Sequence, residues 1–425
     1  MSFETISVIG LGYIGLPTAA MFASNKKNVI GVDVNESTVN TINRGEIHIV
    51  EPELDILVQA AVRQGYLKAT LSPEPADAFL IAVPTPFLPC GEGEVPKPDL
   101  KYIESAAKSI APVLKKGDLV ILESTSPVGA TEQMAQWLAE ARDDLTFPQH
   151  TGEESDIRIA HCPERVLPGK VVKELVANDR VIGGLTKKCS ELSVELYKTF
   201  VEGECVITNA RTAEMAKLTE NSCRDVQIAF ANELSVICDT LDIDVWELIS
   251  LANRHPRINI LQPGPGVGGH CIAVDPWFIV SRTPEQAQLI HTARKVNDSK
   301  PEWVINKVKI AVADFLQANP SKTAKDITIA CYGLAFKADI DDLRESPALQ
   351  IVQKIAKFHS GITLGVDSNI KALPENLNDS GIELVDFEQA KKEAVIHLML
   401  VDHQEFKINP NVGGTLIDTK GVWSK

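Results

Sequence analysis

The stretch VIGLGYIGLP near the N-terminus limits the possible folds more than any other feature of the chain. An apolar, β-branched run reaches Gly10, and Gly12 and Gly15 complete the spacing G-x-G-x-x-G directly before a helix-like segment. This spacing allows a tight turn from strand to helix, a close approach of a pyrophosphate, and close packing of the helix on the strand. Because an ordinary strand-to-helix turn can also contain three glycines, the motif is specific only in the right context.

The next apolar run, NVIGVD, supplies that context. It ends in Asp33, which lies 18 residues after Gly15 (33 minus 15), near the position of the carboxylate that binds ribose hydroxyls in dinucleotide-binding folds. An aspartate at this position would repel a 2′-phosphate, so the sequence favours NAD over NADP. The residues that we expect to form the NAD-binding turn are Gly10, Gly12, Tyr13, Ile14, Gly15 and Asp33.

Short β-branched runs alternate with helical patterns through the first 210 residues. The runs are TISVIG, NVIGVD, AFLIAV, DLVILEST, IRIAHC and RVIGGL. Such alternation indicates a parallel sheet with helices on both faces. The pattern restarts near the C-terminus with ITIACYGLAF, GITLGV, GIELVD, AVIHLML and GTLIDT, which indicates a second sheet of the same kind.

The segment between the two alternating regions is expected to be helical. Residues 212–241 lack proline and glycine and predict one long helix, whereas the prolines and glycines of residues 255–276 predict an extended loop. A further helix is expected near residues 301–316. Dividing 425 residues by about 150 per domain gives about three units. We therefore predict an α/β protein with two Rossmann-like parallel-sheet domains, residues 1–210 and 301–425, joined by a long central helix and a helical middle region, residues 211–300.

The charge of the chain excludes some classes of partner. With 57 acidic and 42 basic residues, the net charge is −15, which would repel nucleic acid or an anionic membrane. Basic residues are therefore expected to matter locally, where a phosphorylated ligand binds. The eight cysteines contain no CxxC pair, which disfavours zinc sites and a disulfide framework. The N-terminus lacks the features of a signal peptide and no apolar run is long enough to span a bilayer, so we expect a cytoplasmic protein without a metal.

Polar loops follow three strands of the first sheet, at the edge where ligands bind in parallel α/β proteins. AVPTPF contains Thr85, ESTSPVGAT contains Thr125, Ser126 and Thr131, and AHCPERVLPG contains Glu164 and Arg165. Serine, threonine and proline are also common in turns, and adjacent opposite charges are typical of solvated loops. The residues alone therefore leave a binding role and a turn role open.

The long helix carries three polar residues on one face. Lys217, Asn221 and Arg224 are spaced four and three residues apart, so they lie on the same side of a helix. Apolar residues on the other faces, including Met215 and Phe230, are expected to pack. A helix this apolar is expected to be buried on most sides, and burial would depress the pKa of Lys217 and suit it to proton transfer. The alternative is a solvent-facing polar stripe.

The glycine-rich loop holds the most unusual cysteine. In GPGVGGHCIAVDP, Cys271 lies among glycines rather than among apolar neighbours, and Asp275 follows four residues later. Glycines allow the backbone to approach a ligand closely. Upstream, NRHPRINI contributes His255 and Arg257, and an arginine beside such a loop suits a phosphate or carboxylate. A histidine beside a proline is more often structural.

Together these motifs resemble the nucleotide-sugar 6-dehydrogenases of the UDP-glucose/GDP-mannose dehydrogenase family over nearly the whole chain. The resemblance rests on VIGLGYIGLP, AVPTPF, ESTSPVG, CPER, AEMAKLTEN, the cysteine loop and GLAFKADIDDLRESPA. Relatives that oxidise UDP-glucose usually carry a loop like GGSCFPKD, whereas this chain has GGHCIAVDPWF preceded by NRHPRINI. That departure resembles the branch that acts on UDP-N-acetyl-D-mannosamine. The stretch LPCGEGEVPK, residues 88–97, resembles an inserted loop without an assigned role.

The resemblance implies a four-electron oxidation of a UDP-sugar to its uronate with NAD. Such a reaction needs a nucleophile, because an aldehyde gives up a second hydride only after a nucleophile has added to it. Cys271 would form a thiohemiacetal and then a thioester. Lys217 would move the proton of the alcohol, with Asn221 as a second donor to the oxyanion. Asp275, Glu164 and Thr125 would position or activate water.

The resemblance also implies binding roles, a dimer and a pathway. The substrate would contact Arg165, Val166, Lys217, Asn221, Arg224, His255, Arg257, Gly268 and Lys337. NAD would contact Thr85, Ser126, Thr131 and Arg344 in addition to the turn. Arg257 would reach the substrate of a neighbouring subunit, so the middle region would form a homodimer and residues 301–425 would bind the UDP-sugar. The uronate would feed a surface polysaccharide of the enterobacterial common antigen type.

Several alternatives remain at this point. UDP-N-acetylglucosamine and UDP-glucose are other possible substrates, because epimers differ at a single centre. Outside the family, one alternative is a two-electron hydroxy-acid dehydrogenase with a similar NAD-domain layout and a structural Cys271, and another is an NAD-binding sensor without catalysis. The second α/β region and the glycine-rich cysteine loop argue against the first of these, and the presence of both Lys217 and Cys271 argues against the second.

Overall fold

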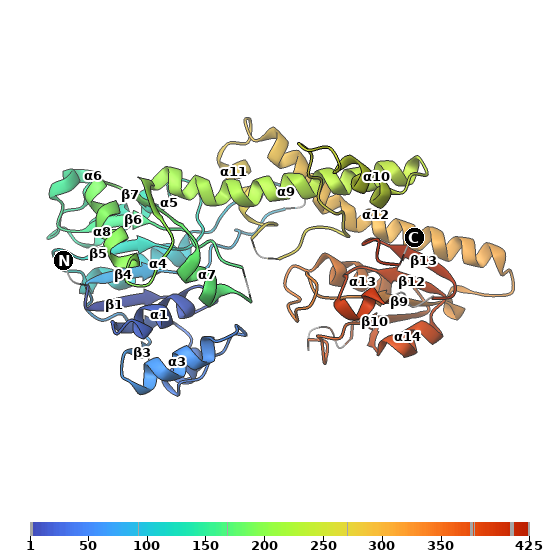
Figure 1. Ribbon diagram of the computed structural model, residues 1–425, viewed down its shortest axis with the longest axis horizontal. Helices are drawn as coiled ribbons and strands as arrows, with labels where there is room; N and C mark the ends of the chain where they lie inside the picture. Colours follow the sequence, from blue (N-terminus) through green and yellow to red (C-terminus); the bar gives the residue numbers. More distant parts are fainter. Residues whose placement is uncertain are drawn as a thin grey trace. The chain divides into compact units, whose positions relative to one another are not determined.

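The computed structural model describes residues 3–91, 93–167, 169–269, 271–374, 377, 379–408 and 412–423. The chain divides into two compact units (Figure 1). The first contains residues 1–220 and 277–283, and the second contains residues 221–276 and 284–425. The helix α9 (Ala210–Thr240) begins in the first unit and ends in the second.

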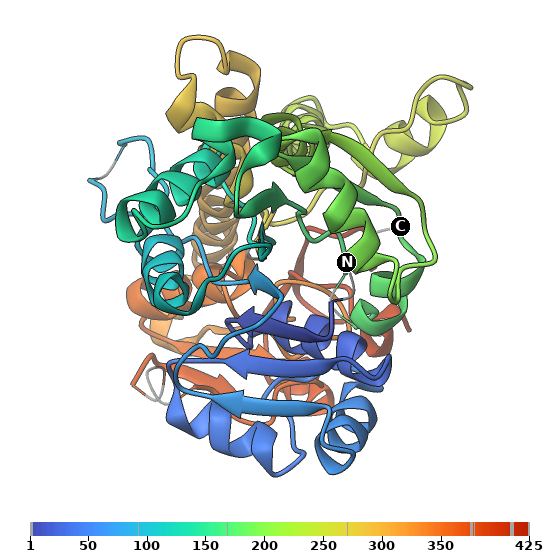
Figure 2. The same cartoon turned by 90° about the vertical axis from the view of Figure 1, so that its left-hand side faces the viewer.

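The first unit is built on one sheet, in which the described residues form eight strands. Their order is β3-β2-β1-β4-β5-β6-β7-β8. The strands are β1 (Thr5–Ile9), β2 (Asn28–Val32), β3 (Leu67–Thr70), β4 (Ala78–Ile81), β5 (Leu119–Leu122), β6 (Arg158–His161), β7 (Arg180–Gly184) and β8 (Cys205–Asn209). In Figure 2 the blue strands β1, β2 and β3 run side by side. Neighbouring strands are parallel except β6 and β7, which are antiparallel.

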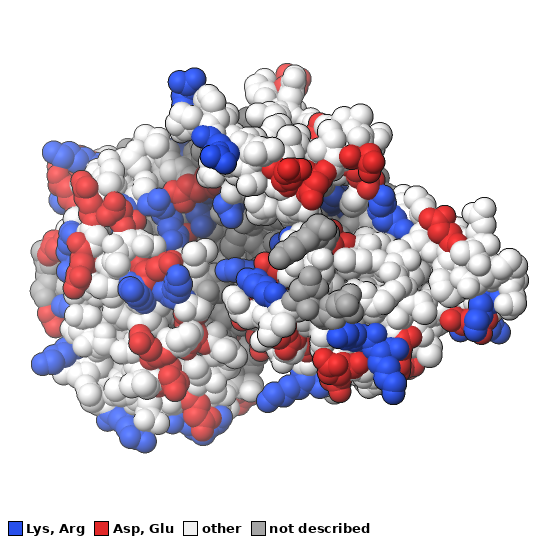
Figure 3. Space-filling view, turned by 45° about the vertical axis from the view of Figure 1, so that its right-hand side comes forward, with Lys and Arg blue, Asp and Glu red and all other residues white. Residues whose placement is uncertain are grey.

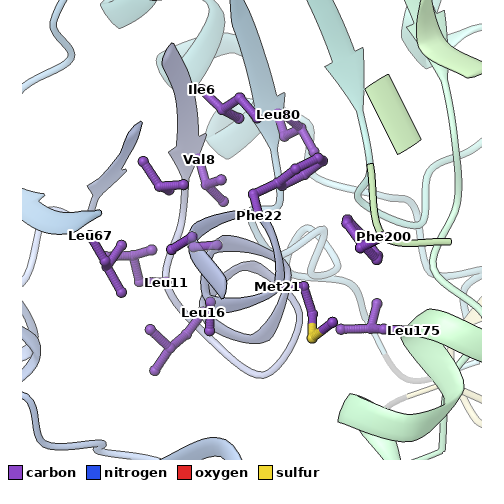
Figure 4. Packing of buried hydrophobic residues seen from close by; sticks show 14 of the residues in the cluster. Ile6, Val8, Leu11, Leu16, Met21, Phe22, Leu67, Leu80, Leu175 and Phe200 are labelled. Carbon is purple, nitrogen blue, oxygen red and sulfur yellow. The ribbon is translucent and has the colours of Figure 1, made fainter. Parts of the chain in front are cut away.

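Helices cover both faces of this sheet because its central strands are apolar on both faces. In β4, Leu80 packs in a core with α1 (Gly15–Ser24), α3 (Leu54–Arg63), α7 (Val171–Ala177) and α8 (Lys187–Tyr197), part of which Figure 4 shows. Its neighbours Phe79 and Ile81 face a second core with α4 (Lys101–Ile110) and α5 (Ala130–Ala141). The described residues of this unit also form α2 (Glu36–Asn43), α6 (Pro148–Thr151) and most of a helix at residues 275–282.

The second unit has a five-stranded parallel sheet within its described residues. The order is β11-β10-β9-β12-β13. The strands are β9 (Thr328–Tyr332), β10 (Ile362–Val366), β11 (Ile382–Leu384), β12 (Ile396–Met399) and β13 (Thr415–Asp418). One face packs on α12 (Gln288–Ala318) and α13 (Pro347–Phe358), and the other on α14 (Phe387–Glu393). Before these elements comes α10 (Val245–Ala252), whereas most of α11 (Asp275–Arg282) belongs to the first unit.

The expected fold class is confirmed, with differences in detail. The strands β3 and β8 were not predicted. The predicted start of the helix near residues 301–316 is wrong, because α12 begins at Gln288 and contains Pro301. Buried residues before and after the proline, among them Ala293 and Val304, hold the helix across this point despite the missing amide donor. Met215 and Phe230, expected to pack, are exposed on α9.

None of the helices that the structure describes has the length and apolar character needed to cross a membrane. On the face that Figure 3 shows, basic and acidic side chains are interspersed, so neither sign forms a broad patch there.

Candidate active site

The turn between β1 and α1 has the backbone that its glycines require. Gly10 has a φ of 91°, and a Cβ atom there would lie 2.5 Å from the carbonyl oxygen of Ala82. A Cβ on Gly15 would lie 1.8 Å from the carbonyl oxygen of Gly10, so this glycine allows the helix to pack against the turn. By contrast, a Cβ on Gly12 would meet no atom within 4 Å. The residues therefore fit a dinucleotide whose pyrophosphate approaches the backbone at Gly12.

The acidic residue at the end of β2 is anchored to the same turn. Asp33 accepts a hydrogen bond from the amide of Leu11 at 3.0 Å through Oδ2 and from the amide of Asn35 at 2.9 Å through Oδ1. Its half-buried carboxylate is therefore fixed beside the glycines, as ribose recognition requires. Of the two residues between the glycines, Tyr13 is 37% exposed and Ile14 is half-buried.

The threonines and serines of the next loops have different environments. Thr85 is buried, and its hydroxyl has no partner among the described residues, which fits a ligand that accepts or donates a bond there. Ser126 donates to the carbonyl of Ser124 at 2.8 Å. Thr125 is half-buried. Two of the four predicted loop residues, Ser126 and Thr131, have hydroxyls engaged within the protein.

Thr131 is held by a residue that the sequence did not indicate. Glu214 of α9 is 1% exposed, and it accepts hydrogen bonds from the hydroxyl and amide of Thr131 at 2.6 and 2.8 Å and from the amide of Gly129 at 2.7 Å. Burial raises the pKa of Glu214, although these bonds act in the opposite direction. The carboxylate thus caps the start of α5 and fixes the loop that contains Thr125 and Ser126.

Glu164 belongs to a buried pair of acids that share one arginine. Its Oε1 accepts the amide of Arg165 at 2.6 Å and its Oε2 accepts Arg180 at 2.8 Å. The guanidinium of Arg180 also lies 3.9 Å from Glu123. Burial, together with the charge of Glu164, raises the pKa of Glu123 to about 8. The arginine is therefore balanced mainly by Glu164, which stays oriented by two bonds. Val166 is half-buried against the core.

The side chain of Arg165 points to α9 instead of to Glu164. Its guanidinium forms an ion pair with Glu220 at 2.6 Å and donates to the carbonyl of Asp179 at 3.2 Å. This arginine is partly exposed, so a phosphorylated ligand could exchange with Glu220 as its partner.

The polar face of α9 is half-buried rather than buried. Lys217 and Asn221 are intermediate in exposure and Arg224 is exposed, so the expectation of a fully buried lysine is wrong. The expectation failed because α9 has an exposed apolar face that no element of this chain covers among the described residues. Asn221 donates through Nδ2 to the carboxylate of Asp275 at 2.5 Å. The structure therefore brings together two residues that are 54 positions apart.

Cys271 lies one turn before α11. Its side chain is exposed, and its carbonyl accepts the amides of Val274 at 3.1 Å and Asp275 at 2.9 Å. The preceding residue, 270, lies outside the described residues. The glycine next to it, Gly269, has a φ of 81°.

The cysteine loop packs against the segment after β9. A Cβ on Gly268 would lie 2.5 Å from Pro347 and 2.6 Å from the carbonyl oxygen of Glu345, so only glycine fits there. That segment also contains two residues predicted to bind ligands, both exposed: Lys337 and Arg344. Arg344 currently pairs with Asp342 at 2.6 Å.

A buried polar network fixes the start of the same loop. Arg294 donates to Asp225 at 2.6 Å, Asn297 donates to Asp225 at 2.8 Å, and Asn232 donates to Asn297 at 2.9 Å. The carbonyl of the Asn232 side chain then accepts the amide of Gly264 at 2.9 Å. These residues couple α9 and α12 to the glycine-rich loop, and the sequence analysis missed them.

His255 and Arg257 lie on an exposed loop after α10. The amide of Arg257 donates to Nδ1 of His255 at 3.3 Å. Asn253 closes the loop, since its side chain accepts the amide of Ile260 at 2.7 Å and donates to the carbonyl of Ile260 at 2.9 Å. The guanidinium of Arg257 is thereby presented outward on a constrained loop.

The stretch 88–97 is a loop closed at its base, with residue 92 outside the described residues. The amide of Leu88 donates to the carbonyl of Lys97 at 2.8 Å, next to an antiparallel bridge between Phe87 and Pro98. The described part of the chain contains no cluster of three or more potential metal ligands.

Comparison with known proteins decides the family. The models of the UDP-glucose/GDP-mannose dehydrogenase family match as its NAD binding domain at residues 4–201, its central domain at residues 211–299 and its UDP binding domain at residues 330–425. The chain belongs to this family. As a UDP-glucose/GDP-mannose dehydrogenase family member it is a nucleotide-sugar dehydrogenase that uses NAD, and its UDP binding domain indicates a UDP-sugar as substrate. The expectations of family and cofactor are confirmed.

Individual relatives within the family are similar over their full lengths. The UDP-N-acetyl-D-mannosamine dehydrogenase of Yersinia pestis is 67% identical, with 100% of both chains covered. The NDP-N-acetyl-D-galactosaminuronic acid dehydrogenase of Ralstonia nicotianae is 62% identical, with 100% of this chain and 97% of that protein covered. A solved structure of the UDP-N-acetyl-mannosamine dehydrogenase from S. aureus has a TM-score of 0.83 at 40% identity, covering 99% of this chain and 96% of that one.

Proposed function

We propose that this enzyme oxidises UDP-N-acetyl-D-mannosamine to UDP-N-acetyl-D-mannosaminuronate with two molecules of NAD⁺. The observation that carries the proposal is the 67% identity, with 100% of both chains covered, to an enzyme named for that substrate. The 62% identity to an NDP-N-acetyl-D-galactosaminuronic acid dehydrogenase makes an N-acetylgalactosamine nucleotide the second candidate. Both candidates share the acetamido group and differ in the configuration of the sugar.

The first step removes the hydroxyl proton and one hydride from the primary alcohol of the sugar. We assign the proton to Lys217, with the amide of Asn221 as a second donor to the oxygen. When bound, NAD⁺ supplies the hydride acceptor for each of the two oxidations. The groups that we assign to its binding are the glycine turn with Tyr13 and Ile14, together with Asp33, Thr85, Ser126, Thr131 and Arg344.

The second step requires Cys271. Its thiolate adds to the aldehyde carbon, and the carbonyl oxygen takes up a proton to give a thiohemiacetal. Loss of that proton and of the second hydride converts the adduct into a thioester. The exposed thiol of Cys271 at the start of α11 supports this role, because an accessible thiolate is the required nucleophile.

Water then hydrolyses the thioester and regenerates the thiol. We assign Asp275 and Glu164 to the water, with Thr125 positioning it. Two bonds hold the carboxylate of Glu164, and Asn221 orients the carboxylate of Asp275 at 2.5 Å. Both acids are therefore pre-oriented, as a base that activates one water molecule must be.

We assign the contacts with the UDP-sugar to residues from the NAD binding, central and UDP binding domains. These are Arg165, Val166, Lys217, Asn221, Arg224, His255, Gly268 and Lys337. The cationic members suit the diphosphate of UDP. Because the protein has a net charge of −15, these residues are needed to concentrate positive charge where the ligand binds.

We further propose a homodimer in which Arg257 reaches the substrate of the partner subunit. The exposed apolar residues Phe230 and Ile237 on α9 support an intersubunit contact, since large apolar side chains on one helix favour burial against a partner. We place the enzyme in the cytoplasm, where thiols such as those of its eight cysteines stay reduced, and its product in the synthesis of a surface polysaccharide.

Mixing two inactive variants tests the shared site. If Arg257 acts across the interface, a hybrid dimer of R257A and C271A subunits has one site with both residues intact. Statistical mixing after reversible dissociation should then restore about a quarter of wild-type activity. If Arg257 acts within its own subunit, no site in any dimer is complete and the mixture stays inactive.

The substrate assignment is tested by kcat/KM for four UDP-sugars: N-acetylmannosamine, N-acetylgalactosamine, N-acetylglucosamine and glucose derivatives. We expect the N-acetylmannosamine derivative to be preferred by at least about tenfold, as a site built to hydrogen-bond one hydroxyl configuration discriminates against its epimers. Preference for the galactosamine derivative would support the second candidate and overturn the first.

A further inference from the structure

A buried acid outside the predicted site holds the loop that follows β6. Glu51, which lies between α2 and α3, is 4% exposed. Its Oε2 accepts the amide of Gly169 at 2.8 Å, and its Oε1 accepts the amide of Val171 at 2.7 Å. These two residues lie 118 and 120 positions after Glu51, and residue 168 is outside the described residues. Both oxygens of one carboxylate therefore fix the end of a distant loop.

The amides that Glu51 accepts lie at the start of α7. The first amides of a helix have no partner within the helix, so another group must accept them. The residue before α7, Lys170, makes no side-chain capping bond. Glu51 supplies the missing acceptor from another part of the chain, and the helix start and the loop before it are thereby tied to the segment between α2 and α3.

The segment that carries Glu51 is itself constrained. Ile49 is 7% exposed and packs in the same core as α1, and Leu54 at the start of α3 is fully buried. Between them, Glu53 has a φ of 67°, which is unfavourable for a residue with a Cβ atom. A residue keeps such a conformation where the contacts around it determine the backbone. Glu51 is therefore presented to the loop from a fixed position.

The loop between β6 and α7 carries groups that the proposed function assigns to the reaction. At its start, Glu164 is held without Glu51, because it accepts Arg180 at 2.8 Å and the amide of Arg165 at 2.6 Å. Arg165 and Val166, both assigned to the substrate, follow directly and are half-buried. These two residues therefore lie between an anchor at Glu164 and an anchor at Glu51.

We infer that Glu51 is a positioning residue for the substrate: through the amides of Gly169 and Val171 it holds Arg165 and Val166 in the conformation that binds the UDP-sugar. The inference rests on the proposed function, which assigns these two residues to that ligand. Because Glu51 acts through the loop alone, its loss should weaken binding of the sugar. The chemical step should be retained, since Glu164 keeps its own two bonds.

Steady-state kinetics of the full-length enzyme test this role. In E51A we expect KM for the UDP-sugar to rise about tenfold, as for a loop that holds its binding conformation about a tenth of the time. The value of kcat should stay within about twofold of the wild type, because the chemical step is unchanged. In E51Q one oxygen still accepts an amide while the NH₂ group faces the other, so KM should rise less, by about threefold.

Asp77 provides the matched control. Its Oδ2 accepts the amides of Glu4 and Thr5, both at 3.0 Å and 73 and 72 positions away. These bonds lie at the start of β1, at the edge of the sheet opposite to the carboxyl ends where ligands bind. D77A should therefore lower Tm and leave KM for the UDP-sugar unchanged.

Thermal melting shows which variants are folded at the assay temperature. A folded E51A or E51Q variant whose KM equals that of D77A would overturn the inference, as would a loss of kcat at unchanged KM. The assay uses whichever UDP-sugar the wild type prefers. A preference for another sugar would therefore overturn the proposed substrate and leave the test of Glu51 in force, so the two failures are distinguishable.

Discussion

The amide nitrogen of Asn221 lies 2.5 Å from a carboxylate oxygen of Asp275, which joins the polar face of α9 to the first residue of α11. Asp275 is 3% exposed, and its backbone amide donates to the carbonyl of Cys271. One hydrogen bond therefore ties α9 at Asn221 to the turn that carries the proposed nucleophile.

This hydrogen bond predicts that kcat will depend on pH differently in two variants at position 221. N221D places two carboxylates at hydrogen-bond distance, where like charges cannot both ionise without a large cost. Relative to the wild type at the same pH, its kcat should fall at least about tenfold at pH 8 and less near pH 5, where the pair shares a proton. N221A should lose activity without such recovery. Parallel profiles for both variants would show that the contact does not control activity.

The proposed nucleophile is tested against another exposed cysteine. C271S should lose at least about a thousandfold in overall uronate formation, because a hydroxyl at its ordinary pKa is a poor substitute for a thiolate. Cys223, which is exposed on α9, provides the matched control, and C223S should retain normal kcat. Uronate formation by C271S at the rate of C223S would assign Cys271 a structural role.

The buried network that holds the glycine-rich loop predicts that breaking two different ion pairs will lower the free energy of unfolding by very different amounts. D225A removes the fully buried carboxylate partner of Arg294, which keeps only its ion pair with the half-exposed Asp298, and should lower the free energy of unfolding by about 3 kcal/mol. D239A breaks the pair with Lys307, in which both side chains are about one third exposed, and should cost less than about 1 kcal/mol. Urea unfolding of the two variants measures the difference. Equal midpoints would contradict the assigned role of the network.

Lys300 predicts a specific dependence of stability on pH. Burial lowers its pKa from 10.5 to about 7, while its ammonium contacts Ser235 and lies 3.7 Å from the ring of Trp303. The unfolded chain therefore binds more protons than the folded one between pH 7 and 10.5, so stability rises across that window.

Replacing Lys300 with methionine should remove this dependence of stability on pH. K300M should be more stable than the wild type at pH 6.5, and the difference in Tm should shrink as the pH rises towards 10. The partly exposed Lys307 is the control, since K307M should keep the wild-type slope. A K300M variant whose Tm follows the wild-type pH dependence would show that Lys300 does not titrate in this range.

The parts of the fold that were predicted are those that a short stretch of sequence determines by itself. Gly10 is required by its positive φ, and Gly15 is required by its close contact with the carbonyl of Gly10, so both requirements arise within a few residues. The central strands are continuous apolar runs, so they were found. The edge strand β8 was missed although its residues CVITN include β-branched ones, and it is mostly exposed. The inner position of Pro301 in α12 was missed because tertiary packing extends the helix across it.

The candidate site was only partly predictable for a similar reason. Cys271 and Lys217 were indicated by their immediate neighbours. The residues that hold the site in place, such as Glu214 and Asp225, have partners between 69 and 85 positions away. Both are among the five acidic residues of α9, so nothing in the sequence singled them out. Their partners became identifiable only when the fold brought the segments together.

The central claim, a four-electron oxidation through Cys271, is tested most directly by counting NADH released per UDP-N-acetyl-D-mannosamine consumed. The account predicts two NADH for each sugar and a uronate as the product. One NADH per sugar, with the aldehyde as the final product, would contradict it.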